Sequence, residues 1–241
     1  MPNTYFQFKQ FTVHHDRCAM KVTTDGCLFG AWASAAILSA QPELKTCLDI
    51  GTGSGLLSLM IAQKNNSGID AIEIDSDAAA QAKENIAASA WSNQINVITQ
   101  DVLSWQTAKQ YDCIVSNPPF YESELKSGRK TKDLAHHDEG LKLPQLFAFI
   151  KNHLTEEGIF FLLLPAKRAK EIDGLLKQGG LYQHQRIEVK QTPNHQPFRL
   201  MIMGGKKEVE QVGEATMFVK DENDKYTPAF TVLLKDYYLY L

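Results

Sequence analysis

The residues with the clearest chemical potential are an asparagine, two prolines and a phenylalanine in a row, Asn117, Pro118, Pro119 and Phe120. They directly follow an apolar run at 113–115, which predicts a buried strand. Because proline cannot donate to a sheet and fixes its own backbone, this strand should stop abruptly and the chain beyond it should be stiff. Asn-Pro-Pro turns also occur where they only end a strand, so this stretch indicates a functional site only in combination with other residues.

A glycine-rich turn supplies part of that context. The stretch DIGTGSG places Gly51, Gly53 and Gly55 between a predicted strand and a predicted helix. Glycine permits a tight turn and lets the backbone approach a ligand closely. Such spacing alone is weak evidence, because a turn that binds nothing can share it.

Two acidic residues end the strands that follow this turn. Glu73 ends the next predicted strand, where a carboxylate can accept hydrogen bonds from both hydroxyls of a ribose. Asp101 ends the strand after it, where it could reach an adenine amino group. Since open α/β sheets bind ligands at the carboxyl ends of their strands, these residues predict a site for an adenosine-containing cofactor.

Two cofactors of this kind fit the pattern, a nicotinamide dinucleotide and S-adenosylmethionine. The dinucleotide fingerprint G-x-G-x-x-G, started at Gly51, requires a glycine at position 56, which is Leu56. The spacing therefore favours S-adenosylmethionine, which has no pyrophosphate to hold.

The elements that would position these residues alternate between strand-like and helix-like from about residue 47, as a parallel α/β sheet requires. Continuous apolar runs indicate strands that are covered on both faces. Strands are expected at 46–50, 68–74, 95–101, 111–116 and 158–165, and helices at 30–40, 56–64, 76–90, 143–154 and 166–180.

The pattern changes after residue 180. Stretches 184–192 and 198–206 are strand-like with only a proline-bounded loop between them, which predicts an antiparallel pair. A further pair of strands is predicted at 214–220 and 228–234. On the late strands, Phe198 is expected to pack in the core, with stacking or charge from Phe198 and Arg199 as the alternative.

Composition limits the classes of function. The net charge of −3 and the pI of about 6.2 argue against a general nucleic-acid binder, which should be basic over much of its surface. One basic patch, either a polyanion contact or a solvated loop, follows the Asn-Pro-Pro-Phe stretch and contains Lys126, Arg129, Lys130 and Lys132.

Neither a membrane span nor a metal site is expected. The longest apolar run, 159–164, is far shorter than the roughly 20 residues that span a bilayer, and no secretory signal is visible at the start. A cytoplasmic protein is therefore expected. Four widely spaced cysteines and two adjacent histidine pairs predict neither a disulfide framework nor a metal centre.

Taken together, residues 49–55, Glu73, Asp101 and 117–120 resemble the Rossmann-like S-adenosylmethionine-dependent methyltransferases, and more narrowly those that methylate planar amino groups. The resemblance implies a doubly wound α/β fold with a mostly parallel seven-stranded sheet and an antiparallel last strand pair. It also implies one domain over 1–241, with an N-terminal extension and cofactor-flanking helix at 1–45, a core sheet at 46–205 and a C-terminal β extension at 206–241.

The resemblance also implies a chemistry. The amine of adenine is nearly flat and a poor nucleophile, because its lone pair is delocalised into the ring. The side-chain oxygen of Asn117 and the carbonyl of Pro118 would accept its N–H groups, and Phe120 would stack on the ring. The cofactor would leave as S-adenosylhomocysteine, and no metal is implied.

Two groups of relatives suggest different substrates. Enzymes with N-P-P-Y methylate a glutamine amide in release factors, whereas enzymes with N-P-P-F include those that methylate N6 of the adenine beside the anticodon of a valine tRNA. Stretches 19–33 and 226–239 and the chain length are similar to the second group. The alternatives are the glutamine methyltransferase and, from another class, a non-catalytic module that binds S-adenosylmethionine or RNA.

Residue roles follow from the resemblance. The tRNA, through its anticodon stem-loop, is the expected partner, with no membrane and no stable protein partner. Phosphate contacts are expected from Lys126, Arg129, Lys130 and Lys132. The cofactor is expected to contact Asp49, Gly51, Gly53, Gly55, Glu73 and Asp101, and its methionine end Lys21, Thr23 and Asp25.

Overall fold

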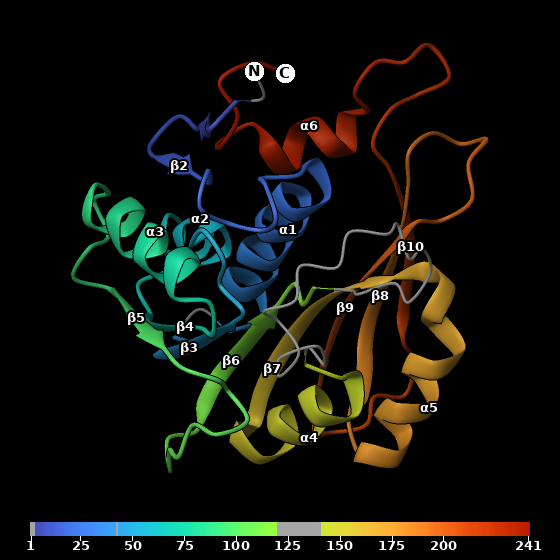
Figure 1. Ribbon diagram of the computed structural model, residues 1–241. Coiled ribbons are helices and arrows are strands. Elements are labelled where there is room, and N and C mark those ends of the chain that lie inside the picture. The colour runs from blue at the N-terminus through green and yellow to red at the C-terminus, as the bar shows by residue number, and fades with distance from the viewer. Residues whose placement is uncertain (1–2, 42, 120–140) are drawn as a thin grey trace, which may run out of the picture.

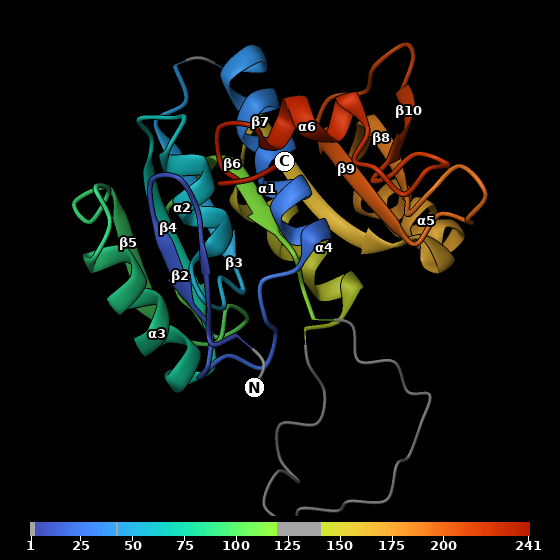
Figure 2. The ribbon, with the colours of Figure 1, turned by 90° about the horizontal axis from the view of Figure 1, so that it is seen from above.

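A large mixed sheet forms the centre of the molecule in a computed structural model, which describes residues 3–41, 43–119 and 141–241 (Figure 1). Within these residues the sheet has eight strands in the order β10-β8-β9-β7-β6-β3-β4-β5. Figure 2 shows them side by side from β5 to β10. The strands are β3 Thr46–Ile50, β4 Gly68–Glu73, β5 Ile95–Thr99, β6 Tyr111–Ser116, β7 Leu154–Pro165, β8 Tyr182–Lys190, β9 Arg199–Gly205 and β10 Gly213–Phe218.

The strand directions confirm the doubly wound sheet. Strands β3 to β7 run parallel to one another, and β9 is antiparallel to both β7 and β8. After β5 the chain returns to the other side of β3 to form β6, so the strand order reverses between β3 and β6. Such a reversal opens a crevice at the carboxyl ends of the two strands. The predicted number of seven strands is one too low, because β10 adds to β8 in parallel.

Helices cover both faces of this sheet (Figure 1). Along β7, Phe161 and Leu163 belong to one apolar cluster, whereas Phe160, Leu162 and Leu164 belong to the other. This explains why residues 159–164 of β7 form a continuous apolar run rather than an alternating one. One cluster includes side chains of α1 Thr24–Ala40, α2 Leu56–Ala62, α3 Ser76–Ala87 and α6 Pro228–Leu234, and the other those of α4 Leu143–His153 and α5 Ala169–Gly179, which follows the short 3-10 helix Ala166–Arg168.

An N-terminal hairpin, β1 Tyr5–Gln7 and β2 Thr12–His14, was not predicted from the sequence. Asn85 of α3 ties it to the sheet domain. Its side-chain oxygen accepts from the His14 N–H at 3.0 Å, and its Nδ2 donates to the His14 carbonyl at 2.8 Å. The same Nδ2 donates to the carbonyl of Ser54 at 2.9 Å, so one side chain joins the hairpin to the glycine turn.

The same hairpin region also contacts the C-terminal segment. The N–H of Lys9 donates to the carbonyl of Tyr237 at 2.8 Å, and Phe8 forms an isolated β-bridge with Tyr238. The side chains of Phe8, Tyr237 and Tyr238 are buried in the cluster that lies over α1.

The strand predicted at 228–234 is wrong, because these residues form α6. The Thr227 side chain caps the helix by accepting from the N–H of Phe230, and Pro228 occupies its first turn, as proline favours. Phe230 and Leu234, four residues apart, are both fully buried. The predicted C-terminal β extension at 206–241 therefore contains one strand and one helix.

Helix α4 leads directly into the sheet. It ends at His153, and β7 begins immediately at Leu154, four residues before the predicted start of the strand. The pairing of β7 with β6 has a register shift near the beginning of β7.

None of the helices in the described part of the chain has both the length and the apolar character that a membrane crossing needs.

Candidate active site

The glycine turn opens toward space rather than toward protein. Gly51, Gly53 and Gly55 have φ angles of +70°, +55° and +83°, a region that side chains rarely adopt. A Cβ added to Gly51 or Gly53 would meet no atom within 4 Å, whereas one on Gly55 would contact Ile86 at 3.5 Å. The first two glycines thus leave a cradle that a ligand can enter, and the third allows α3 to pack closely.

Asp49 is a buried carboxylate with one unused oxygen. Its Oδ2 accepts from the hydroxyls of Thr52 at 2.6 Å and Ser58 at 2.7 Å. Its Oδ1 is buried and has no hydrogen-bond partner in the described part of the chain. Burial raises the pKa of Asp49 to about 6, opposed by the Thr52 and Ser58 hydroxyls and supported by the charge of Glu73. A buried acceptor of this kind suits a donor group from a ligand.

Glu73 and Asp101 are fixed at neighbouring strand ends. Glu73 Oε2 accepts from the N–H of Gly53 at 2.8 Å, and Oε1 accepts from the N–H of Asp75 at 3.0 Å. Asp101 Oδ1 accepts from the N–H of Leu103 at 2.9 Å. Since a carboxylate offers about four acceptor positions, both groups can still accept from a ligand while the protein holds them in place.

Two apolar residues beside these acids were missed by the sequence analysis. Ile74 follows Glu73 and its side chain is 60% exposed, and Leu103 lies two residues beyond Asp101 and is 45% exposed. Exposed apolar side chains on both strand ends suit the faces of a flat ring. The sequence does contain a signal for them, because an apolar residue follows within two positions of each acidic residue at these strand ends.

Asn117 lies at the reversal point of the sheet. In the register, Asp49 and Ile50 of β3 pair with Val115 and Ser116 of β6, so the glycine turn and Asn117 leave the sheet at the same level. The Ser116 hydroxyl donates to the carbonyl of Ile50 at 2.8 Å and ties the two strand ends together.

The Asn-Pro-Pro-Phe stretch is described as far as its third residue. Asn117 is half-buried, Pro118 is buried and Pro119 is exposed. Phe120 lies outside the described residues, as do Lys126, Arg129, Lys130 and Lys132, so their predicted roles stay predictions.

The first turn of α1 lies close to Asn117. A Cβ added to Gly26 would lie 3.8 Å from Nδ2 of Asn117 and 3.1 Å from Oγ1 of Thr23. Thr23 caps this helix by accepting from the Gly26 N–H, and Asp25 Oδ2 accepts from Nε of Arg199 at 2.8 Å. Lys21 is directed elsewhere, since its ammonium donates to the carbonyl of His15 at 2.7 Å. The predicted contacts of Lys21, Thr23 and Asp25 with the cofactor stay predictions.

Phe198 lies near the edge of the sheet from which Asn117 emerges and is 37% exposed, so the prediction that it packs in the core is wrong.

Among the described residues, no group of three or more His, Cys, Asp or Glu side chains could hold a metal ion.

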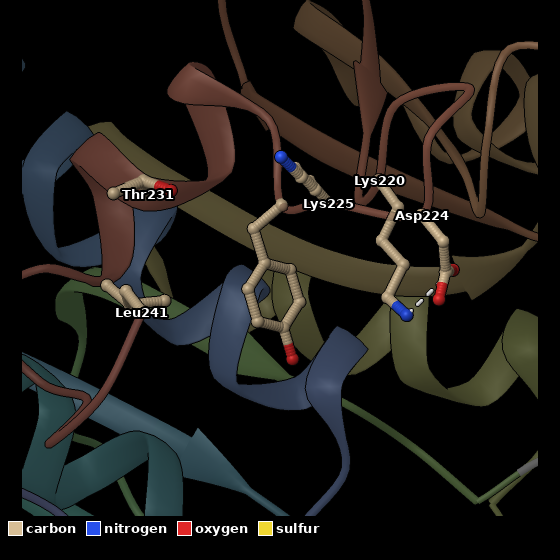
Figure 3. A pocket seen from close by; sticks show the side chains of 6 residues that line it. Lys220, Asp224, Lys225, Thr231 and Leu241 are labelled. Atoms are coloured by element: carbon tan, nitrogen blue, oxygen red, sulfur yellow. Dashed lines mark hydrogen bonds and ion pairs between the residues drawn. The ribbon is translucent and has the colours of Figure 1, made fainter.

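A separate pocket of about 500 Å³ lies beside α6 (Figure 3). Its wall includes Lys220, which pairs with Asp224 at 2.8 Å, and Tyr226. None of its lining residues is a predicted site residue, so it is separate from the crevice at β3 and β6.

Comparison with known proteins gives matches over the whole chain. The family model described as methyltransferase small domain matches residues 31–177. The chain is 39% identical over 241 residues to a tRNA1(Val) (adenine(37)-N6)-methyltransferase of Parabacteroides distasonis, with 99% of each chain covered. It is also 39% identical to the protein of that name from Shigella dysenteriae serotype 1, with 98% of this chain and 95% of that one covered. A solved structure, a predicted O-methyltransferase from Agrobacterium tumefaciens, shares the fold with a TM-score of 0.62, 16% identity, and coverage of 88% of this chain and 96% of that one.

Proposed function

The chain belongs to the methyltransferase small domain family and to the family of the tRNA1(Val) (adenine(37)-N6)-methyltransferases, and from this membership we propose that it methylates N6 of an adenine in tRNA. The proposed target is the adenine next to the anticodon of a valine tRNA. The observation that supports this activity best is the position of Asn117, which lies beside the glycine turn at the reversal point of the sheet.

The proposed methyl donor is S-adenosylmethionine, which supplies an electrophilic methyl group on a sulfonium. The open glycine turn and the unpaired Oδ1 of Asp49 fit this ligand, because they offer close backbone approach and a buried acceptor. Glu73 would accept from the ribose hydroxyls, and Asp101 from the adenine amino group. Ile74 and Leu103 would lie against the two faces of the adenine ring.

Asn117 and Pro118 would act on the nucleophile. The side-chain oxygen of Asn117 and the carbonyl of Pro118 would accept the two N–H groups of the target amine. Accepting both N–H groups draws the nitrogen toward tetrahedral geometry and localises its lone pair. Proline fixes the backbone, so the acceptors are in place before the substrate arrives. Alignment then contributes more than a strong base, because the nitrogen becomes acidic once it is alkylated.

The substrate base must leave its stack to reach this pocket. Enzymes that act on a base extrude it from the surrounding nucleotides. The cationic side chains just after the Asn-Pro-Pro-Phe stretch would then hold the phosphates of the loop: Lys126, Arg129, Lys130 and Lys132.

The test is methyl transfer from labelled S-adenosylmethionine into unmodified valine tRNA, with a release factor as a parallel substrate and Asn117→Ala as the inactive control. The products are digested to nucleosides and amino acids. We expect label in N6-methyladenosine from the wild-type protein and none from the variant. Label confined to glutamine of the release factor would replace the tRNA by a protein substrate, and label in neither would contradict both substrates.

A further inference from the structure

The loop between β8 and β9, residues 191–198, lies at the same edge of the sheet as Asn117. Ser116 of β6 pairs with Leu162 of β7, and three residues further along β7, Pro165 pairs with Arg199 of β9. The loop therefore emerges beyond the end of β7, displaced from the end of β6 by roughly 10 Å across the sheet and by roughly another 10 Å along the strand direction. A nucleotide next to the methylated one can span this displacement.

The backbone holds Phe198 in a fixed place at the end of this loop. Its N–H donates to the carbonyl of Val189 at 2.9 Å, and its carbonyl accepts from the N–H of Ala166 at 3.3 Å. Its side chain is nevertheless 37% exposed, although the apolar core begins at the next residues of β9. An anchored backbone that presents an exposed ring is a suitable platform for stacking.

Arg199 connects this ring to the methyl-transfer site. Its guanidinium carbon lies 6.0 Å from the centroid of the Phe198 ring, and its Nε donates to Asp25 at 2.8 Å. Asp25 belongs to the first turn of α1, and the adjacent Gly26 lies next to Asn117. The Asp25–Arg199 ion pair thus links the residue next to Phe198 to the helix turn that lies beside Asn117.

The charge around the loop suits RNA. Residues 189–207 contain no Asp or Glu in a chain whose net charge is −3, and they include Lys190, His195 and Arg199. The exposed loop residues include Gln191, Asn194 and Gln196, whose amides can donate to phosphates and bases.

We infer that Phe198 stacks on a base of single-stranded RNA next to the methylated adenine, with the β8–β9 loop contacting its backbone. This inference rests on the proposed function and adds a second contact to the site. Aromatic rings between cationic and amide side chains are the usual means of holding unpaired nucleotides. Stacking on the neighbouring nucleotide would also stabilise the RNA conformation in which the target base is turned out.

The experiment measures binding of an unmodified anticodon stem-loop RNA by fluorescence anisotropy in the presence of S-adenosylhomocysteine, together with the turnover of full-length tRNA. The variants are Phe198→Ala and Phe198→Trp. Tyr240→Ala serves as the matched control, because Tyr240 is an aromatic side chain that is 88% exposed on the C-terminal segment. Calorimetry reports the cofactor affinity of each variant.

We expect Phe198→Ala to weaken RNA binding and raise the tRNA KM by about tenfold, within the range for loss of one stacked base. Cofactor affinity should not change, Phe198→Trp should bind at least as well as wild type, and Tyr240→Ala should match wild type. Equal RNA binding by wild type and Phe198→Ala would overturn the inference while wild-type turnover upheld the proposed function. If the wild type neither bound nor methylated the RNA, both would fail.

Discussion

Asn117 receives its position from residues that are distant in the sequence. Its place at a strand end could be predicted, because two prolines directly after an apolar run stop a strand. Its contact with the first turn of α1 follows from the packing of Gly26, which no local pattern reveals. Ile74 and Leu103 were missed for a related reason, since their exposure depends on which surface the fold leaves open.

Replacing Asn117 by alanine removes the proposed acceptor for the target amine. We expect kcat to fall by about a thousandfold, the scale for losing one preorganised polar group at a reaction centre, while cofactor affinity by calorimetry stays near wild type. Asn96→Ala is the control, because Asn96 is an exposed asparagine on β5 that bonds only to Asp70 among the interactions described. Turnover within a few-fold of wild type would contradict the acceptor mechanism.

Asp49 should make stability depend on pH. Burial raises its folded pKa to about 6, above the unfolded value near ~4, so the folded protein binds the proton more tightly. Its contribution to stability is therefore full below about pH 4 and is lost as the pH rises through about 6. Without cofactor at neutral pH, Asp49→Asn should be more stable than wild type by up to roughly 3 kcal/mol in urea unfolding.

The same substitution should weaken the binding of the cofactor, although it stabilises the fold. Asp49 lies just before the glycine turn and its Oδ1 has no partner in the described part of the chain, so a loss of cofactor affinity in Asp49→Asn would indicate a ligand contact, and an unchanged affinity would indicate a purely structural role. Asp77→Asn, at an exposed position in the first turn of α3, is the control. A stability difference that stays constant between about pH 4 and pH 7 would contradict the assignment of the shifted pKa.

At the scale of elements, the sheet and most of the helices could be predicted from the sequence, because strand-like and helix-like stretches alternate along it. The strand predicted at 228–234 was wrong. Phenylalanine, threonine and valine favour strands locally, but these residues form a helix because it packs against α1. The Thr227–Pro228 pair was an available helix-start signal. The β1–β2 hairpin could not be predicted, since its strands have three residues each and depend on a partner more than 60 residues away.

Asn85→Ala should release this hairpin from the glycine turn. The variant loses the bonds to both backbone groups of His14 and to the carbonyl of Ser54. We expect a loss of about 2 kcal/mol in the free energy of unfolding, because three hydrogen bonds are lost and the buried carbonyl of Ser54 is left unpaired. Faster hydrogen exchange at β1 and β2 should accompany it; unchanged exchange there would show that other contacts dock the hairpin.

At the scale of the whole molecule, the negative net charge requires that contact with RNA be local. Proteins that neutralise phosphates release counterions, so each contact adds to the salt dependence of binding. Replacing the basic patch by glutamine should raise the tRNA KM and lower the slope of its logarithm against the logarithm of salt by up to about 3, at roughly 0.7 per contact. The variant changes Lys126, Arg129, Lys130 and Lys132.

A matched control removes four lysines near the opposite, amino-terminal edge of the sheet. Its salt slope should equal that of the wild type, and a slope change as large as that of the basic-patch variant would show that overall charge, rather than local contact, controls binding. The control variant changes Lys45, Lys64, Lys109 and Lys177.

The contact between the segments around Phe8 and Tyr238 has a consequence for synthesis on the ribosome. These aromatic side chains share one buried cluster, yet nearly the whole sequence separates them. The segment around Phe8 is synthesised long before the segment around Tyr238, so its apolar surface stays uncovered until that second segment emerges. Contacts of such long range form late and leave the nascent chain open to association. We therefore expect the core to close only after the segment around Tyr238 has left the ribosome, so that a delay in translating the codons before it lengthens the period of aggregation risk.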